Sequence, residues 1–350
     1  MNSLVTIFIP AYNAEETLAY AIQSAVSQTW PHKQIIVVND GSTDNTEAIA
    51  RRFEPAGVTV VSKKNGGLSD AINHVMPLAE GEFIQELDSD DVLAPDKIER
   101  QLAALRPGDS KRVLLSSAWA PFHYRTRTAR FLNDSLCEDL SPADWLVRKL
   151  SENLYTQNAT WLVSRELAEA AGPWDVDLHY DQDGEYFARV LIASEGTRFV
   201  PGTGVYYRTT TTKSVSYIGR SSRKRESLLR SLKLHIQYLQ SVEQSERVRQ
   251  ACLTYLQNWY FAFYPERPDL VAQMQTMAAS LGGELDEPRL RRKFAWMKPV
   301  FGMKAANWAQ MALPQIRSYV VRRYDKAMLG LEELSASMAE LRAITPAKRG

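Results

Sequence analysis

The chain has 350 residues, of which 45% are hydrophobic and 24% are charged, which is typical of a soluble globular protein and excludes a chain disordered throughout. With 42 basic and 41 acidic residues, the net charge of +1 gives no reason to expect nucleic-acid binding. Two cysteines exclude a disulfide framework and a cysteine-based zinc site. The sequence shows no secretory signal pattern and no apolar run of about 18 residues, so we expect a cytoplasmic protein without a transmembrane helix.

The first 105 residues alternate short apolar runs with amphipathic segments. The apolar runs predict buried strands over 5–10, 34–38, 58–61 and 83–87. Apolar residues at helical spacing predict a helix after each of these strands. This alternation predicts an α/β fold with a mostly parallel, Rossmann-like sheet that is flanked by helices. Ligands of such sheets bind beyond the carboxyl ends of the strands.

The pattern changes twice further along the chain. Strands are predicted over 113–118, 159–163 and 205–208, and helices begin after Ser141, after Ser164 and near Asp183. Beyond about residue 220 only helical spacing remains, at 228–239 and 246–262. We therefore predict a first domain over 1–220 and a helical C-terminal region over 221–350.

Asp88, Ser89, Asp90 and Asp91 follow the fourth predicted strand and form the most distinctive motif. Crowded carboxylates repel one another unless a cation or hydrogen-bond donors compensate their charge. Hard oxygen ligands suit Mg²⁺ or Mn²⁺, which usually also bind substrate phosphates. The alternative is a solvated acidic turn that caps the next helix.

Polar groups also follow the other strands. Tyr12 follows the first strand and can stack on a nucleobase, or it can be an ordinary half-buried tyrosine. Asp40 follows the second strand and can accept the N–H of a uracil-type base, or it can belong to a helix cap. Gly66 and Gly67 precede the third helix, where glycines allow an anion to approach backbone N–H groups; the alternative is a plain turn.

Four segments in this order carry a family resemblance: IPAYNAEETL, IIVVNDGSTDNT, NGGLSDAIN and ELDSDDVLAPDKI. They resemble the family 2 glycosyltransferases of the GT-A fold. The resemblance implies a nucleotide-sugar donor, usually UDP-linked, and a divalent cation, Mn²⁺ or Mg²⁺. It implies that the cation binds Asp90, with Asp91 in support. It implies a donor site that includes Pro10, Tyr12, Glu15, Asp40, Gly67, Asp88 and Ser89.

The segment from Gly172 to Arg189 resembles the part of these enzymes that supplies the catalytic base. The resemblance assigns that role to Asp183, with Asp181 and Glu185 as the nearest rivals. The residue before the base is usually Glu and is Gln182 here, so the acidic pair of the family is incomplete. The alternative is that Asp183 only caps a helix.

A later loop, 206–216, resembles one that closes over the diphosphate in relatives. Here Arg208 and Lys213 can supply positive charge. Relatives often carry His in this loop and Arg at the position of Ile72, and both differ here.

The resemblance implies an inverting glycosyltransferase that transfers a sugar to an acceptor hydroxyl in polysaccharide or glycoconjugate biosynthesis, on a saccharide or lipid-linked acceptor. A nucleotidyltransferase is the alternative enzyme, although no Gly-rich basic loop follows the first strand. A non-catalytic nucleotide-sugar sensor or scaffold is the third possibility.

The stretch from Arg289 to Lys326 is unusually basic, with ten Lys or Arg residues and one acid, Asp325. Its local charge is about +9, so the rest of the chain carries about −8. Interleaved aromatic and aliphatic residues are typical of a helix that lies on an anionic membrane. The alternatives are a helix that packs its aromatic face on the first domain, or another partner.

Overall fold

The computed structural model describes residues 2–209, 218, 221–288, 294, 296–302, 305–306, 309–310 and 321–329. The chain forms two compact units. The sheet unit comprises Met1–Ala120, Phe131–Tyr207 and Val215–Pro288. The C-terminal unit comprises Pro121–Arg130, Arg208–Ser214 and Arg289–Gly350.

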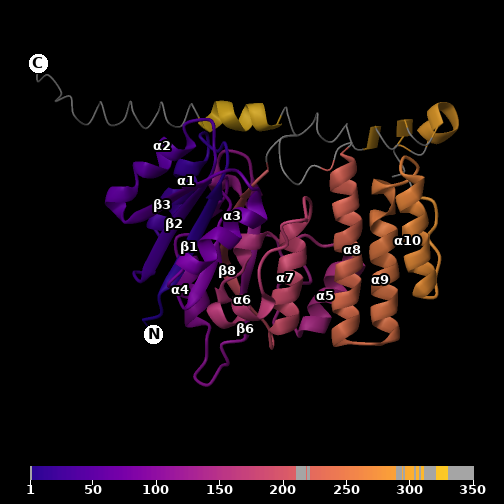
Figure 1. Cartoon of the computed structure of the whole chain (residues 1–350), viewed down its shortest axis with the longest axis horizontal. Coiled ribbons are helices and arrows are strands. Elements are labelled where there is room, and N and C mark those ends of the chain that lie inside the picture. The colour runs from indigo at the N-terminus through magenta and orange to yellow at the C-terminus, as the bar shows by residue number, and fades with distance from the viewer. Residues whose placement is uncertain are drawn as a thin grey trace, which may run out of the picture. The chain divides into compact units, whose positions relative to one another are not determined.

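A five-stranded sheet with the order β3-β2-β1-β4-β7 forms the centre of the sheet unit (Figure 1). Three parallel pairings join β3 to β2, β2 to β1 and β1 to β4, while the edge strand β7 is antiparallel to β4. This arrangement confirms the predicted mostly parallel sheet. The bounds are β1 Val5–Ala11, β2 Lys33–Asp40, β3 Val58–Lys63, β4 Phe83–Glu86 and β7 Val163–Ser164.

Both faces of this sheet are covered because alternate residues of its strands point to opposite sides. On β1, Val5, Ile7 and Ile9 join one apolar cluster, which also contains residues of α1 and α4. Phe8 joins the other cluster, on the side of α3. The bounds of the N-terminal helices are α1 Leu18–Val26, α2 Thr46–Arg51, α3 Leu68–Val75 and α4 Lys97–Ala103, with 3₁₀ turns at Glu54–Ala56 and Met76–Leu78.

A second sheet has the order β5-β8-β6, with bounds β5 Val92–Leu93, β6 Val113–Phe122 and β8 Gly196–Arg208. The strands β6 and β8 extend further than predicted. The strand predicted over 159–163 is confirmed only in its second half. A 3₁₀ turn spans Asn158–Thr160, whereas Trp161 is extended, Leu162 forms an antiparallel bridge with Leu115, and β7 begins at Val163. The Gln157 side chain accepts a hydrogen bond from the Ala159 amide and caps that turn. Another 3₁₀ turn spans Thr126–Thr128.

The second half of the sheet unit is mainly helical, with bounds α5 Pro142–Glu152, α6 Arg165–Ala171, α7 Gln182–Ala193, α8 Ser222–Val242, α9 Glu246–Trp259 and α10 Pro268–Ser280. Ser141 and Ser164 cap α5 and α6 with their hydroxyl groups, as predicted. The 3₁₀ turn Tyr260–Ala262 follows α9. The helix α10 was not predicted, because its buried residues Leu270, Met274 and Ala278 form a sparse stripe.

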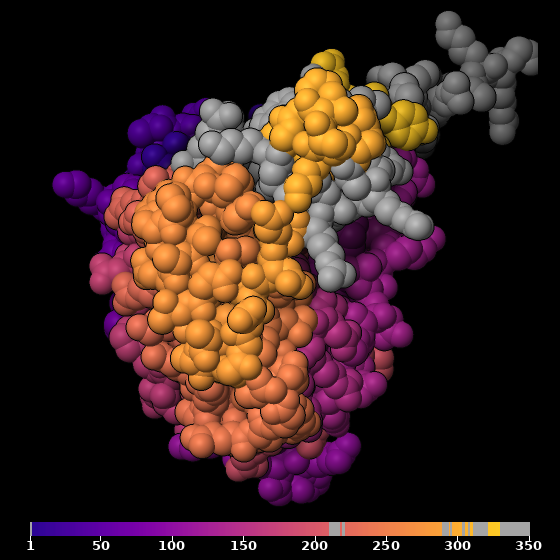
Figure 2. Space-filling view, turned by 90° about the vertical axis from the view of Figure 1, so that its right-hand side faces the viewer, coloured from indigo at the N-terminus to yellow at the C-terminus, as the bar shows by residue number. Residues whose placement is uncertain are grey.

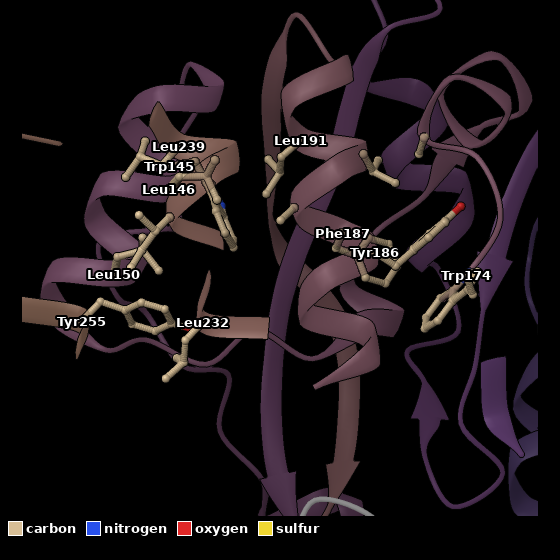
Figure 3. Packing of buried hydrophobic residues seen from close by; sticks show 14 of the residues in the cluster. Trp145, Leu146, Leu150, Trp174, Tyr186, Phe187, Leu191, Leu232, Leu239 and Tyr255 are labelled. Carbon is tan, nitrogen blue, oxygen red and sulfur yellow. The ribbon is translucent and has the colours of Figure 1, made fainter. Parts of the chain in front are cut away.

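One large apolar core joins these helices to the sheet. Figure 3 shows Trp145 and Leu150 of α5 near Leu239, and Trp174 beside Tyr186 of α7. The rings of Trp174 and Tyr186 stack with centroids 4.3 Å apart. The helices α8, α9 and α10 therefore share a core with the sheet, and their outer surface is orange in Figure 2. Within the described residues, no helix is long and apolar enough to cross a membrane.

Candidate active site

Three neighbouring parallel strands bring the predicted donor-site residues to one edge of the main sheet. The pairing register places Ala11 opposite Asn39 and Phe8 opposite Glu86. Parallel strands in register end on the same side, so the residues that follow β1, β2 and β4 share this edge. Tyr12 and Asp88 come after β1 and β4, and Asp40 is the last residue of β2.

Asp40 organises the glycine turn before α3. Its Oδ1 accepts hydrogen bonds from Lys63 Nζ (2.8 Å) and from the Gly66 N–H (2.9 Å), and its Oδ2 accepts one from the Gly67 N–H (2.8 Å). Gly67 has a φ of +88°, which side chains with a Cβ rarely adopt. An ionised carboxylate has about four acceptor positions, so these three bonds leave about one for a ligand. The contact of Asp40 with a nucleobase stays a prediction.

The residues after β1 differ in how they are placed. Pro10 is buried within the strand, whereas the Tyr12 side chain is 53% exposed and available to a flat ligand. The Oε2 of Glu15 accepts hydrogen bonds from the backbone N–H (3.1 Å) and the Nδ2 (2.9 Å) of Asn45. Glu15 thus joins the chain before α1 to the turn before α2, and its role in donor binding stays a prediction.

The acidic motif after β4 is held by an amide that sequence reasoning missed. The Nε2 of Gln157 lies 2.6 Å from Asp91 Oδ2 and 3.2 Å from Asp88 Oδ2. Asp91 and Gln157 are fully buried, while Asp88, Ser89 and Asp90 are half-buried. Gln157 therefore fixes the base of the motif and leaves its other carboxylates nearer to solvent. A polar residue at the start of a short turn was the only sequence signal for it.

The carboxylates of this region repel one another. Burial raises the pKa of Asp88 to about 7, and the neighbouring charges of Asp90 and Asp183 add to the shift. Asp183 lies in the first turn of α7, close enough for its charge to act on Asp88, and its role as the base stays a prediction. Burial, then the charge of Asp181, raises the pKa of Asp183 to about 6. A cation at this edge would relieve the repulsion.

The structure distinguishes Asp183 from its two rivals. Asp181 Oδ2 accepts a hydrogen bond from the Ser231 hydroxyl at 2.5 Å, which ties it to α8. Glu185 is buried and pairs with Arg189 at 2.8 and 2.9 Å. Asp181 and Glu185 are therefore engaged in contacts with helix residues. Of the three candidate acids, Asp183 is the one whose charge raises the pKa of Asp88.

Lys149 lies close enough to Asp183 to change the pKa of that carboxyl group. Lys149 and Asp183 both line one small pocket, together with Trp145, Trp161 and Phe187. Burial lowers the pKa of Lys149, and its positive charge lowers that of Asp183. This ammonium group therefore opposes the effect of burial and keeps part of Asp183 ionised near neutral pH.

Glu86 is a second residue that sequence reasoning missed. It is 4% exposed, and both carboxyl oxygens are buried without a hydrogen bond of ordinary geometry in the described part of the chain. Burial raises its pKa well above the usual value, and Asp88 and Asp183 add to the shift. Burial and the neighbouring carboxylates therefore favour the protonated form of Glu86. Its position in an apolar strand, two residues before Asp88, was the available signal.

Three aromatic side chains gather beside these acids. The ring centroids of Trp119, Tyr155 and Tyr207 lie 5.4 to 5.7 Å apart in all three pairs. Tyr155 remains 43% exposed, while burial of its hydroxyl group, then the charge of Asp183, raises its pKa well above the usual value. We call these three residues the aromatic platform.

The loop predicted to close over the diphosphate is described only at its start, within the C-terminal unit. Arg208 donates a hydrogen bond to the His123 carbonyl (2.8 Å), and its guanidinium lies 4.5 Å from the centre of the Phe122 ring. Lys213 lies outside the described residues. Diphosphate binding by this loop stays a prediction.

Whether this site can hold a divalent cation depends on the carboxylate oxygens that it offers. No group of three His, Cys, Asp or Glu side chains that could hold a metal ion occurs among the residues that the structure describes. Mg²⁺ and Mn²⁺ commonly bind one or two carboxylates and complete their shell with substrate phosphates and water. The carboxylates of Asp88 and Asp90, whose mutual repulsion is high, fit that mode.

The comparisons with known proteins agree with this geometry. The family model for glycosyl transferase family 2 matches residues 6–130, which contain β1 to β4 and the acidic motif. Residues 6–130 therefore match the family 2 glycosyltransferases. An uncharacterised glycosyltransferase of Rickettsia typhi is 31% identical over 193 residues, which are 55% of this chain and 60% of that protein. Pasteurella multocida chondroitin synthase is 41% identical over 98 residues, or 27% of this chain and 10% of the synthase.

Solved structures confirm the GT-A fold of the chain. S. aureus TarS 1-349 in complex with UDP-GlcNAc superposes with a TM-score of 0.65 at 15% identity, covering 89% of this chain and 92% of that one. The mannosyltransferase PcManGT of Pyrobaculum calidifontis, in complex with GDP-Man and Mn²⁺, gives a TM-score of 0.51 at 18% identity and covers 93% and 88%. The match to the Rickettsia protein spans about three fifths of that relative.

Proposed function

We propose that this chain is an inverting glycosyltransferase that uses a nucleotide-sugar donor, most simply a UDP-sugar. The observation that carries the proposal is the meeting of Tyr12, Asp40 and Asp88 at one sheet edge with Asp183 close enough to Asp88 to raise its pKa. A donor site needs a flat group for the base, acceptors for its N–H and carboxylates near the diphosphate. The TarS complexes with UDP and UDP-GlcNAc, which share the fold, support the choice of donor.

The acidic motif would bind the diphosphate end of the donor. Asp90, assisted by Asp88, would hold Mn²⁺ or Mg²⁺, which supplies charge neutralisation to the leaving nucleoside diphosphate when bound. Asp91 would not bind the cation itself. Its carboxylate accepts a hydrogen bond from Gln157, and this bond would hold the turn that carries Asp90 in place. The Mn²⁺ of the PcManGT structure supports this choice of cation.

Asp183 would act as the general base. It takes the proton of an acceptor hydroxyl while that oxygen attacks the anomeric carbon and the nucleoside diphosphate departs from the opposite face. A base works best when its pKa lies near the operating pH, and the pKa of about 6 for Asp183 meets this condition. One displacement inverts the anomeric centre. The raised pKa of Glu86 favours its neutral form, which would limit the negative charge near the reacting groups.

The acceptor would lie against the aromatic platform. Binding sites for organic ligands combine apolar or aromatic surfaces with a few placed polar groups. Trp119, Tyr155 and Tyr207 offer such a surface beside Asp183, and the apolar face of a sugar ring can pack on it. A saccharide or a lipid-linked saccharide of a polysaccharide or glycoconjugate pathway is the proposed acceptor class.

Calorimetric titration of the full chain with UDP and GDP, each with Mn²⁺ and with EDTA, tests the donor assignment. We expect one nucleotide to bind in a metal-dependent way, and Tyr12→Ala to weaken that binding. The exposed Tyr20→Ala is the matched control, because Tyr20 is 51% exposed on α1. Absence of binding by either nucleotide would contradict the proposal. Binding without turnover of any donor would favour the sensor or scaffold.

A further inference from the structure

One face of α8 carries a row of buried polar side chains. Ser227, Ser231 and His235 follow one another at intervals of four residues, so they lie on the same face of the helix. Their exposed fractions are 6%, 0% and 1%. Burying polar groups is unfavourable unless they find polar partners, so the partners of this row show what it does. We call these three residues the polar row of α8.

The first two residues of the polar row bind the three residues that lead into α7. The Ser227 hydroxyl accepts hydrogen bonds from the backbone N–H groups of His179 (2.8 Å) and Tyr180 (3.0 Å). One helical turn later, the Ser231 hydroxyl donates its 2.5 Å hydrogen bond to Asp181 Oδ2. The segment 179–181 is therefore attached to α8 at two successive turns of that helix.

His235 continues the row by one more turn. Its Nδ1 lies 3.8 Å from Asp181 Oδ2 and 2.8 Å from the hydroxyl oxygen of Tyr255 on α9. Burial lowers the pKa of His235, which favours its neutral form. The polar row therefore surrounds the Asp181 carboxylate with hydrogen-bonding groups that favour no additional charge beside the acids of the site.

The backbone of Asp181 has a conformation that residues with a Cβ rarely adopt. Its φ is +61°, and its carbonyl accepts a hydrogen bond from the Glu185 N–H (3.1 Å) at the start of α7. A Cβ at Gly184 would overlap Asp181 Oδ1, so the glycine leaves room for this carboxylate. Such a backbone persists only where its surroundings fix it. The polar row provides that fixation two residues before Asp183.

We propose that Ser227, Ser231 and His235 are positioning residues that fix the start of α7, and with it the Asp183 carboxylate, for the transfer reaction. This inference rests on the proposed function, because it requires Asp183 to act as the base. Asp183 lies in the first turn of α7, so its side chain moves with the segment that the polar row holds. A displacement of about 1 Å near a reacting group can lower a rate about a hundredfold.

The proposal gives the helical second half of the sheet unit a part in the reaction. The helix α8 lies outside residues 6–130, which match the family model. If the polar row served only to pack α8 against α7, its loss would lower the free energy of unfolding and leave the turnover number of the folded chain unchanged. The experiment below separates these two roles.

Steady-state release of nucleoside diphosphate, from the donor that the parent chain hydrolyses, tests the proposal. Ser231→Ala should lower kcat about tenfold or more, while the KM for the donor changes by less than about twofold. Asp181→Gly tolerates the positive φ but has no acceptor for the Ser231 hydroxyl, so its kcat should fall by a similar factor. Asp181→Asn keeps an acceptor oxygen and should retain most of the parent kcat. The double variant should be no slower than either single variant, because both substitutions remove the same contact.

Ser164→Ala is the matched control, because Ser164 is a serine with 1% exposure that caps α6 instead. This substitution should lower the free energy of unfolding, as Ser231→Ala does, and leave kcat unchanged. A Ser231→Ala variant that keeps the parent kcat would overturn the proposal. So would an Asp181→Asn variant that is as slow as Asp181→Gly.

Amide hydrogen exchange of the full chain separates this proposal from the proposed reaction, since it requires no turnover. We expect Ser231→Ala to accelerate exchange in peptides that span 179–186, and Ser164→Ala to leave exchange there unchanged. Unchanged exchange in the Ser231→Ala variant would overturn the positioning role even if the parent chain hydrolysed its donor. A parent chain that hydrolyses no donor would contradict the proposed function, whereas faster exchange in Ser231→Ala would still support the attachment of this segment to α8.

Discussion

The side-chain amide of Gln157 donates a 2.6 Å hydrogen bond to Asp91 where both groups are fully buried. The same nitrogen lies 3.2 Å from Asp88, so one neutral side chain supports two members of the acidic motif. An amide can do this at low cost, because it stabilises the carboxylates without adding charge to a crowded site. The motif is therefore positioned from a turn 66 residues later in the chain.

Gln157→Leu should weaken donor binding and lower the free energy of unfolding by about 1–3 kcal/mol, because a buried carboxylate loses a donor. Gln157→Glu should be worse, since it places another acid beside Asp91. Gln28→Leu is the control, because Gln28 is a buried glutamine that bonds the Ala94 carbonyl instead. Denaturant unfolding and nucleotide titration would measure both effects. Equal nucleotide affinity in the Gln157→Leu and Gln28→Leu variants would contradict a role for Gln157 at the motif.

Asp183→Asn should lower the rate of sugar transfer by about a factor of 10³ and leave nucleotide affinity largely unchanged, because the amide cannot accept the acceptor's proton. Asp181→Asn should retain most of the activity, since Asp181 is bound to Ser231. Steady-state assays on both variants make the comparison. If the Asp181 variant lost activity and the Asp183 variant kept it, the assignment of the base would be wrong.

Asp90→Ala should weaken metal-dependent nucleotide binding by about tenfold or more, the equivalent of about 1.4 kcal/mol. Removal of the metal by EDTA should have the same effect on the parent chain. Asp177→Ala provides the control, because the Asp177 side chain is 78% exposed. Titration with UDP at a series of Mn²⁺ concentrations is the measurement. Unchanged affinity in the Asp90 variant would place the cation elsewhere.

The ionisation of Asp183, the proposed general base, should determine how the turnover rate depends on pH. Only the ionised form of Asp183 accepts a proton, so the rate should rise with pH through about 6, above the ordinary aspartate value of 3.8. The direction is upward because burial favours the protonated form, which is inactive. A pH–rate profile at saturating donor would show this rise, which we call the acidic limb of the profile. A rate that is already constant at pH 5 would contradict it.

Lys149→Met should move that limb to higher pH, because the ammonium group lowers the pKa of Asp183. Lys149→Arg keeps the charge and should leave the limb near its original position. Lys111→Met, on the surface of the sheet unit, controls for the loss of net charge. An unchanged limb in the Lys149→Met variant would show that this charge does not act on the base.

Sequence reasoning predicted the parts of the fold that depend on local periodicity and missed those that depend on distant contacts. The strands near Ile7 and Val37 are almost continuous apolar runs, so their burial could be predicted. The turn at Asn158–Thr160 was predicted as a strand, because its shape depends on a side-chain cap at Gln157. The resemblance assigned the role of base to Asp183, which stays a prediction, whereas the positions of Gln157 and Glu86 near the motif required the structure.

The measurement that tests the central claim most directly is release of nucleoside diphosphate by the full chain from a panel of UDP-, GDP- and TDP-sugars, with Mn²⁺, Mg²⁺ or EDTA. Slow hydrolysis of the donor can report the reaction when the acceptor has not been identified. We predict metal-dependent release from one donor by the parent chain, and strongly reduced release when Asp90 is replaced by Ala. Absence of release from every donor, together with absence of metal-dependent nucleotide binding, would contradict the proposal that this chain is a nucleotide-sugar glycosyltransferase.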